Sequence, residues 1–235
     1  KRDQWFRDYL RQRGVGQADL GKPLGEVEFP QDMMEAKHLP RDADLPTRRI
    51  AYLAAKFGQW WSIQRLRQAT DGLHAAIPGM KSETLPTSHG FFNGWGSPHL
   101  GMSYKLLDLF EIASQQAVDV LAAEDWLGLN HMYGPEYTWT GAQSFEYLSA
   151  IIRSGIGARP IKLMGLITPS DDKYLRLKAY SCLGQGAKTF FFWTFGPTYI
   201  GTENYWSDLR GAYEGIARFT RMLDKAEDVL WPAQT

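Results

Sequence analysis

The sequence has little cysteine, no net charge and no long apolar run. Cys182 is the single cysteine among 235 residues, which excludes an internal disulfide framework and a zinc site built from cysteines. The 26 basic and 26 acidic side chains balance, so the chain lacks the excess of positive charge expected of a protein that binds nucleic acids or membrane surfaces. No apolar run approaches the ~20 residues that span a bilayer. We therefore expect neither nucleic acid nor membrane as a partner.

Several motifs are also missing. No Gly-x-Gly-x-x-Gly follows a predicted strand, and no phosphate-loop lysine motif is present, so a nucleotide role has no support. No Gly-x-Ser-x-Gly elbow accompanies Ser88 or Ser170, which argues against a serine hydrolase. His89 and His99 flank a glycine-rich segment without a compact set of metal ligands. We expect no metal and no cofactor.

Aromatic residues, in contrast, are abundant. Nine tryptophans, 11 tyrosines and 12 phenylalanines make up 14% of the chain, which gives ample apolar area for a core and excludes disorder. Many of them fall in turn-rich polar stretches, which indicates a cleft lined by rings, with core packing as the alternative. The length suits one large α/β domain or two small ones, and we predict a single domain over residues 1–235.

The chain begins with helical patterns and then alternates between strands and helices. Residues 2–13 predict a helix, residues 15–46 a long loop with one helical turn, and residues 47–77 a long helix whose buried stripe ends at Ile77. Strands are predicted at Lys81–Pro86, Val118–Ala123, Ile161–Thr168 and Lys188–Phe195. Helices are predicted at Ser103–Gln116, Ala142–Ser154, Asp172–Leu183 and Ser207–Val229. Strand–helix units with polar residues after each strand are typical of a β/α barrel or a doubly wound sheet.

Several segments carry a family resemblance. Trp5–Arg11 with Gly14 is similar to a Phe-Arg-x-Trp-Leu helix, and Val118–Trp126, Arg159–Leu166 and Gly186–Pro197 are similar to late barrel strands. Together they resemble the later part of a clan A glycoside hydrolase barrel, nearest the family 42 β-galactosidases. The resemblance implies a (β/α)8 TIM-barrel fold, of which this chain holds the C-terminal half, strands five to eight.

The resemblance also implies a chemistry. Retaining enzymes of this clan cleave a β-linked glycoside or oligosaccharide with two carboxylates about 5–5.5 Å apart and no cofactor. Two departures stand against it: the acid/base glutamate of strand four would precede Lys1, and the nucleophile position on strand seven aligns with Gly165. They favour an alternative, a catalytically silent barrel that binds carbohydrate or serves as a scaffold.

Glu124 and Asp125 are the candidate catalytic residues, because they follow an apolar strand directly. Adjacent residues point to opposite faces of a strand, so one of the two faces the cleft, and we favour Glu124. The alternative is a salt-bridged strand end or a helix cap.

A second group of candidates would hold the sugar, since carboxylates and rings together bind sugar hydroxyls and apolar sugar faces. Glu203 lies among aromatics, and the clan often ends its last strand with a tryptophan, here Trp193. Packing or capping is the alternative for each. The candidate substrate-binding residues are Glu203, Trp193, Trp126, His89, Asn204 and Trp206.

Four strand–helix units are half of a closed barrel, and four parallel strands alone leave two open edges. We therefore expect a truncated larger protein, pairing with the missing barrel half, or a homo-oligomer. Polysaccharide use would suggest a secreted or periplasmic location.

Overall fold

The computed structural model describes residues 1–30, 39–85, 108–124, 135–168, 172–192 and 212–233, except for the side chains of 135–142 and 212. Its helices are α1 (Arg2–Gln12), α2 (Gln17–Leu20), η1 (Leu24–Glu26, a 3-10 helix), α3 (Leu45–Ala76), α5 (Leu109–Ser114), α6 (Pro135–Ile156), α7 (Asp172–Gly184) and α8 (Ala212–Leu230). Its strands are β1 (Glu83–Thr84), β2 (Val120–Glu124), β3 (Lys162–Ile167) and β4 (Ala187–Phe192). The four predicted strand positions are thus confirmed.

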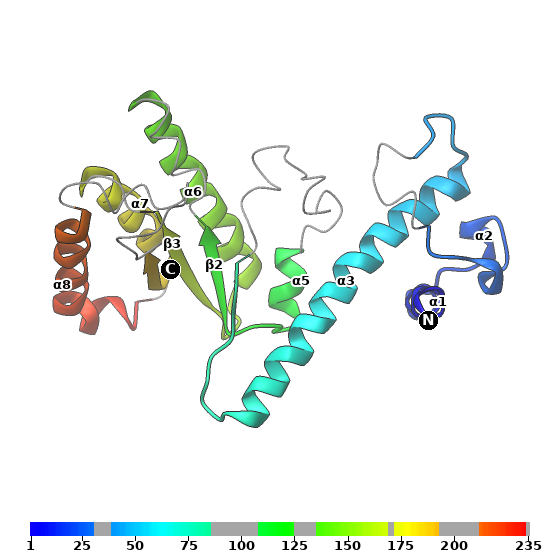
Figure 1. The fold of residues 1–235 in the computed structure, drawn as a ribbon, viewed down its shortest axis with the longest axis horizontal. Helices are drawn as coiled ribbons and strands as arrows, with labels where there is room; N and C mark the ends of the chain where they lie inside the picture. The colour runs from blue at the N-terminus through cyan, green and yellow to red at the C-terminus, as the bar shows by residue number, and fades with distance from the viewer. Residues whose placement is uncertain (31–38, 86–107, 125–134, 169–171, 193–211, 234–235) are drawn as a thin grey trace, which may run out of the picture.

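The four strands form one parallel sheet in the order β1-β2-β3-β4, which is also their order along the chain. The fold class is therefore mixed α/β. Within the described part of the chain, β1 and β4 are the edge strands. Figure 1 shows β2 and β3 beside helices α6 and α7, which follow them along the chain.

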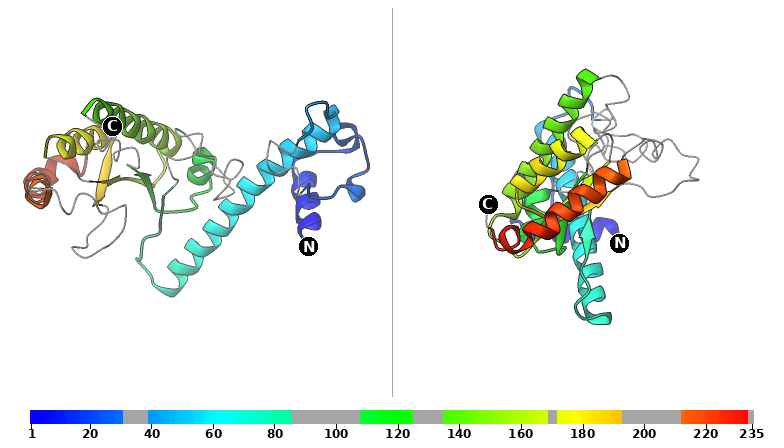
Figure 2. Two further views of the ribbon diagram at one scale, coloured as in Figure 1. Left: turned by 45° about the horizontal axis from the view of Figure 1, so that its top comes forward. Right: turned by 90° about the vertical axis from the view of Figure 1, so that its left-hand side faces the viewer.

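The helices pack on one face of this sheet, called here the helix face. Alternate strand residues, among them Leu121, Leu163 and Ile167, join helix residues in one buried hydrophobic cluster. Its helix members include Ile112 of α5, Phe145, Leu148 and Ile152 of α6, Leu175 and Cys182 of α7, and Phe219 of α8. The remaining strand residues lie on the other side of the sheet, called here the opposite face. Helices α6, α7 and α8 form one layer in the views of Figure 2.

A second hydrophobic cluster lies at the N-terminal end. Helix α1 buries Phe6, Tyr9 and Leu10, which recur at the spacing of one helix face. They pack against Ile50 and Phe57 in the first half of α3. The segment between α1 and α3 contains α2 and η1, two short helical elements where the sequence predicted one turn.

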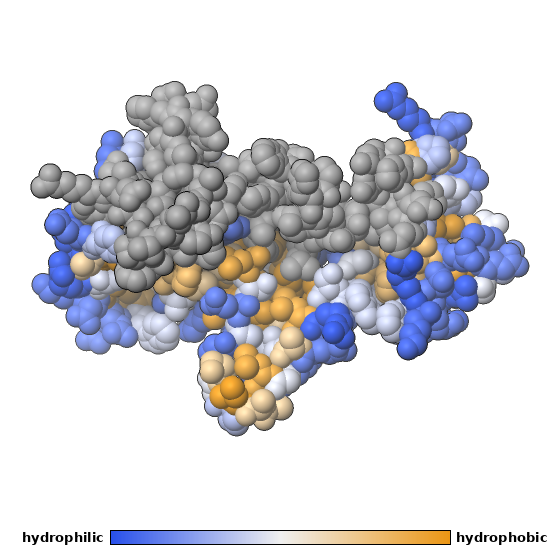
Figure 3. Space-filling model, viewed as in Figure 1, coloured by the Kyte–Doolittle hydropathy of each residue, from blue (hydrophilic) through white to orange (hydrophobic). Residues whose placement is uncertain are grey.

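Helix α3 connects the two clusters. Its 32 residues give a length of about 48 Å. The carboxylate of Asp44 accepts a hydrogen bond from the backbone N–H of Thr47 at 2.8 Å and so caps the helix, and Ile63 further along joins the sheet cluster. The predicted burial of Ile77 is wrong, because α3 ends at Ala76 and the chain turns away. Ile77 and Met80 contribute to an exposed hydrophobic surface at this end of α3 (Figure 3).

Candidate functional site

The carboxyl ends of three strands bring a carboxylate and an aromatic ring to the opposite face. Glu124 of β2 is in register with Leu166 of β3, which is in register with Phe191 of β4. Neighbouring strands lie about 4.8 Å apart, so the backbones of Glu124 and Phe191 are about 10 Å apart. Glu124 is half-buried and Phe191 is 43% exposed. Leu166 lies between them in register on the same face and is 4% exposed.

Strand alternation places Glu124 on this face. Leu121 and Ala123 point into the helix-side cluster, so Val120, Ala122 and Glu124 point to the other side. The apolar residues before Glu124 pair with both neighbouring strands and bury the strand, which leaves the carboxylate at its end. Glu124, the carboxylate favoured from the sequence, thus lies on the face of the sheet opposite to the helices, and its catalytic role stays a prediction.

Gly165, which the resemblance placed at the nucleophile position, lies elsewhere. It is in the middle of β3 and faces the helices: a Cβ on it would lie 2.9 Å from Cys182 Sγ of α7 and 3.1 Å from the Phe190 ring. Its lack of a side chain thus reflects close packing of strand on helix. The end of β3 on the opposite face belongs instead to Thr168, which continues the alternation of Met164 and Leu166 and is 4% exposed.

Lys178 is a buried cation that the sequence analysis missed. It is 1% exposed, and its Nζ donates a hydrogen bond to the Thr168 carbonyl at 3.4 Å. It shares a buried stripe of α7 with Leu175, Ala179 and Cys182. A charged residue inside an apolar stripe of this spacing is the signal that would have found it, since buried lysines need partners. Its hydrogen bond joins the middle of α7 to the end of β3.

An ion-pair cluster lies at the amino ends of α7 and α8. Asp172 is 3.1 Å from Arg176 of the same helix and 3.1 Å from Arg218 of α8, which also lies 3.6 Å from Glu214. All four side chains are partly exposed, so each pair is worth at most about 1 kcal/mol. The cluster joins the two helices at the same edge of the sheet as Glu124.

Of the predicted site residues, Glu124 is the one that the structure describes. The others lie outside the described residues: Asp125, Trp126, His89, Trp193, Glu203, Asn204 and Trp206. Phe191, two positions before Trp193, is the exposed aromatic ring that sequence reasoning missed, because the run Phe190–Phe192 has the composition of a fully buried strand.

Comparisons with known proteins add no family. The chain matches no protein-family model, no curated protein and no solved structure. Within the described residues, no group of three or more histidine, cysteine, aspartate or glutamate side chains is placed to hold a metal ion. No helix in that part of the chain combines the length and the apolar character needed to cross a membrane.

Serine, histidine and aspartate meet at the other edge of the sheet. Asp119 Oδ2, just before β2, accepts hydrogen bonds from His74 Nε2 at 2.8 Å and from the Ser82 backbone N–H at 2.8 Å. The Ser82 hydroxyl also donates to Asp119, at 3.1 Å. A catalytic triad needs the histidine between serine and aspartate, whereas here the aspartate is central. The cluster therefore joins α3 to the strands and does not activate Ser82.

The cluster changes the pKa of the Asp119 carboxyl group. Burial by itself raises the pKa of the Asp119 carboxyl, but hydrogen bonds from Ser82 and His74 together lower it more. The pKa of Asp119 therefore lies below its ordinary value of 3.8. Lys81 adds a cation at 3.7 Å from Asp119 Oδ1.

Proposed function

We propose that this chain is part of a glycoside hydrolase-like β/α barrel that acts on a β-linked glycoside or oligosaccharide, with Glu124 as a catalytic carboxylate. The observation that carries the proposal is the pairing of Glu124 with an exposed ring, Phe191, on one face at the carboxyl edge of a parallel sheet. Active sites of β/α barrels lie at this edge. A ring covers the apolar face of a sugar, while a carboxylate reaches its hydroxyls or the glycosidic oxygen.

The strand order supports a barrel over a doubly wound sheet. In a doubly wound sheet the strand order reverses at a switch point, and helices cover both faces. Here four strands follow one another in sequence, and the helices of the described segments pack on one face. A β/α barrel has this order and this single helical layer.

Hydrolysis needs a second carboxylate, and Asp125 and Glu203 are the candidates within the chain. In a retaining mechanism one carboxyl group protonates the leaving oxygen and the other attacks the anomeric carbon. An inverting mechanism would place a water between two carboxyl groups that lie ~6.5–9.5 Å apart.

A second candidate function, a silent carbohydrate-binding barrel, is favoured by the end of β3. The position where this clan carries its nucleophile corresponds, on the opposite face, to Thr168, whose hydroxyl cannot replace a glutamate as nucleophile without an activating base. This protein would bind sugar through Phe191 and Glu124 without cleaving it.

Turnover of a panel of aryl glycosides by wild type and Glu124→Gln tests the first proposal. We expect the substitution to lower kcat at least about 100-fold, because it removes a proton-transferring or nucleophilic group. Glu83→Gln is the matched control, since Glu83 is an exposed carboxylate on the same face at the amino edge. It should leave kcat unchanged.

Two outcomes would contradict the assignment. A Glu124→Gln variant as active as the wild type would remove Glu124 from the mechanism. A folded wild type that cleaves no glycoside but binds oligosaccharide, with weaker binding in Phe191→Ala, would establish the silent barrel instead.

A further inference from the structure

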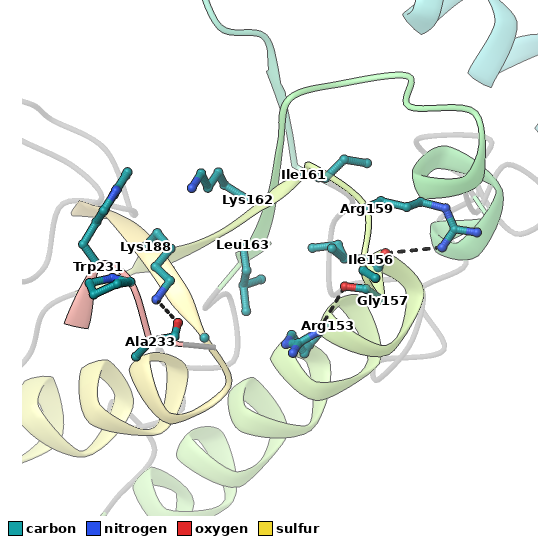
Figure 4. Close-up of a pocket in the computed structure, with 13 residues that line it drawn as sticks. Arg153, Ile156, Gly157, Arg159, Ile161, Lys162, Leu163, Lys188, Trp231 and Ala233 are labelled. Carbon is teal, nitrogen blue, oxygen red and sulfur yellow. Dashed lines mark hydrogen bonds between the residues drawn. The ribbon is translucent and has the colours of Figure 1, made fainter. Parts of the chain in front are cut away.

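A cavity of about 580 Å³ opens at the amino edge of the sheet, on the far side from Glu124. It lies between the end of α6, the starts of β3 and β4 and the segment after α8 (Figure 4). A cavity of this volume is large enough for a small-molecule ligand. None of the residues that line it has a role in the proposed function.

The lining of this cavity is strongly basic. Four cationic side chains line it, Arg153, Arg159, Lys162 and Lys188, and the lining contains no aspartate or glutamate. The chain as a whole has no net charge, so such a concentration of one sign is a local feature. Trp231, 52% exposed, adds a flat ring to the wall, with Lys162 Nζ 4.4 Å from the ring centroid.

Helix capping accounts for part of this charge. Arg153 donates to the Gly157 carbonyl at 3.3 Å and Arg159 to the Gly155 carbonyl at 3.2 Å, both at the end of α6. Lys188 Nζ donates to the Leu230 and Ala233 carbonyls at 2.6 and 2.7 Å, at the end of α8. Each helix C-terminus carries roughly half a negative charge, so two of them leave an excess of about three positive charges.

Lys162 is the cation that capping does not explain. In the described part of the chain its Nζ lies over the Trp231 ring, 4.4 Å from the centroid. Lys188 lies beside it because of a β-bulge: Leu163 pairs with Ala187 and Met164 with Thr189, so Lys188 has no partner position on β3. Bulges redirect side chains, and this one turns Lys188 toward the cavity. Figure 4 shows Lys162, Lys188 and Trp231 together on one side of it.

The lowered pKa of Lys188 is consistent with this excess of positive charge. Burial lowers the pKa of the Lys188 ammonium, and the positive charge of Lys162 lowers it further. An anion bound beside Lys188 would stabilise the charged form of its ammonium group.

We propose that this cavity binds a small molecule through a phosphate group, with Lys162 and Lys188 as ligands of the phosphate oxygens and Trp231 as a wall. Arginine and lysine bind phosphate by charge-assisted hydrogen bonds, which are the strong ones. The site is separate from the carboxyl edge, so it would hold a ligand that is neither substrate nor product of the proposed reaction.

Calorimetric titration of the full chain with inorganic pyrophosphate at low ionic strength tests the proposal. We expect saturable binding with one site per chain. Binding should weaken about tenfold in Lys162→Gln and in Lys188→Gln, because each loses one charge-assisted hydrogen bond. Added salt should weaken it further, since the attraction is between charges.

The matched control is Lys173→Gln. Lys173 is also an exposed lysine over a ring, 5.6 Å from the Tyr174 centroid, but it lies outside the cavity. It should bind pyrophosphate as the wild type does, and so should Glu124→Gln, which separates this site from the proposed function. The proposal is overturned if the folded wild type shows no saturable binding, if the folded Lys162→Gln and Lys188→Gln variants bind as well as the wild type, or if Lys173→Gln weakens binding equally.

Discussion

At the scale of single residues, Gly165 shows how packing and catalysis compete as explanations for one glycine. Its Cα faces α7 so closely that a methyl group would overlap Cys182 Sγ, 2.9 Å away. The glycine is thus required where strand and helix touch. The missing side chain at this point is therefore explained by packing, on the face of the sheet opposite to Glu124.

Gly165→Ala should therefore destabilise the protein by about 1–3 kcal/mol, because the new methyl group forces Cys182 or Phe190 to move in a packed core. Chemical denaturation measures this change. Gly184→Ala is the matched control: it lies at the end of α7, where a Cβ would meet nothing within 4 Å, and should cost nothing.

Repeating the Gly165→Ala substitution in a Cys182→Ala protein distinguishes a steric clash with the sulfur from a general loss of packing. In Cys182→Ala the sulfur is gone, so Gly165→Ala should cost less there than in the wild type. An equal cost in both backgrounds would show that Cys182 does not set the limit.

At the scale of elements, the Asp119 carboxylate ties α3 to the sheet. His74 from the last turns of α3 and Ser82 from the start of β1 both donate to Asp119, which precedes β2. Thr70 of α3 adds a hydrogen bond to the Ala117 carbonyl at 2.8 Å. A helix, two strands and the chain between them are thus held at one point.

Asp119→Asn should cost about 1–3 kcal/mol of unfolding free energy at pH 7, since it weakens several partly buried hydrogen bonds. The pKa of Asp119 is lower in the folded than in the unfolded chain, so the carboxylate stabilises the fold above pH ~3.8 and this contribution is lost as the pH falls through the folded pKa. The difference between wild type and variant should therefore shrink below pH ~3.8. Urea unfolding at a series of pH values measures it.

The exposed Asp71 supplies the control, because it pairs with Arg67 on the surface of the same helix at 3.8 Å. Asp71→Asn should change stability by less than about 0.5 kcal/mol at every pH. A difference for Asp119→Asn that stays constant down to pH 2 would contradict the assigned pKa direction.

Elements with clear periodicity could be predicted from the sequence, and the faces of the strands could be predicted only in part. Residues 2–13 and 47–77 show helical spacing, and each became a helix within two residues of its predicted start. Glu124 could be placed at the end of a strand because an apolar run, Val120–Ala123, directly precedes it. Phe191 could not, because three consecutive phenylalanines have no alternation and the bulge at Lys188 changes which of them faces the helices.

Hydrogen bonds between residues that are distant in the chain also could not be predicted from the sequence. Lys178 occupies a core position because a carbonyl 10 residues earlier in the chain lies within its reach, and His74 meets Asp119 across 45 residues. Such pairs depend on how α3 and α7 pack against the sheet, and no local pattern specifies that packing.

At the scale of the whole molecule, α3 is shared by two hydrophobic cores. Phe57 is the centre of the N-terminal core, with the rings of Phe6 and Tyr9 both 5.4 Å away and that of Phe29 at 5.7 Å. Ile63, almost two turns further along α3, belongs to the sheet core. Both cores include residues of α3, but no buried side chain belongs to both clusters. This separation favours local unfolding of one core without the other.

Phe57→Ala should therefore unfold the N-terminal core and leave the sheet intact. The substitution removes about 3–5 kcal/mol of packing from a core of few residues. Amide hydrogen exchange should show lost protection in α1 and the first half of α3, with unchanged protection in β2 and β3. Tyr52→Ala, an exposed position on the same helix, should alter neither region. If instead β2 and β3 lose protection together with α1, α3 transmits folding between the cores and the molecule is a single cooperative unit.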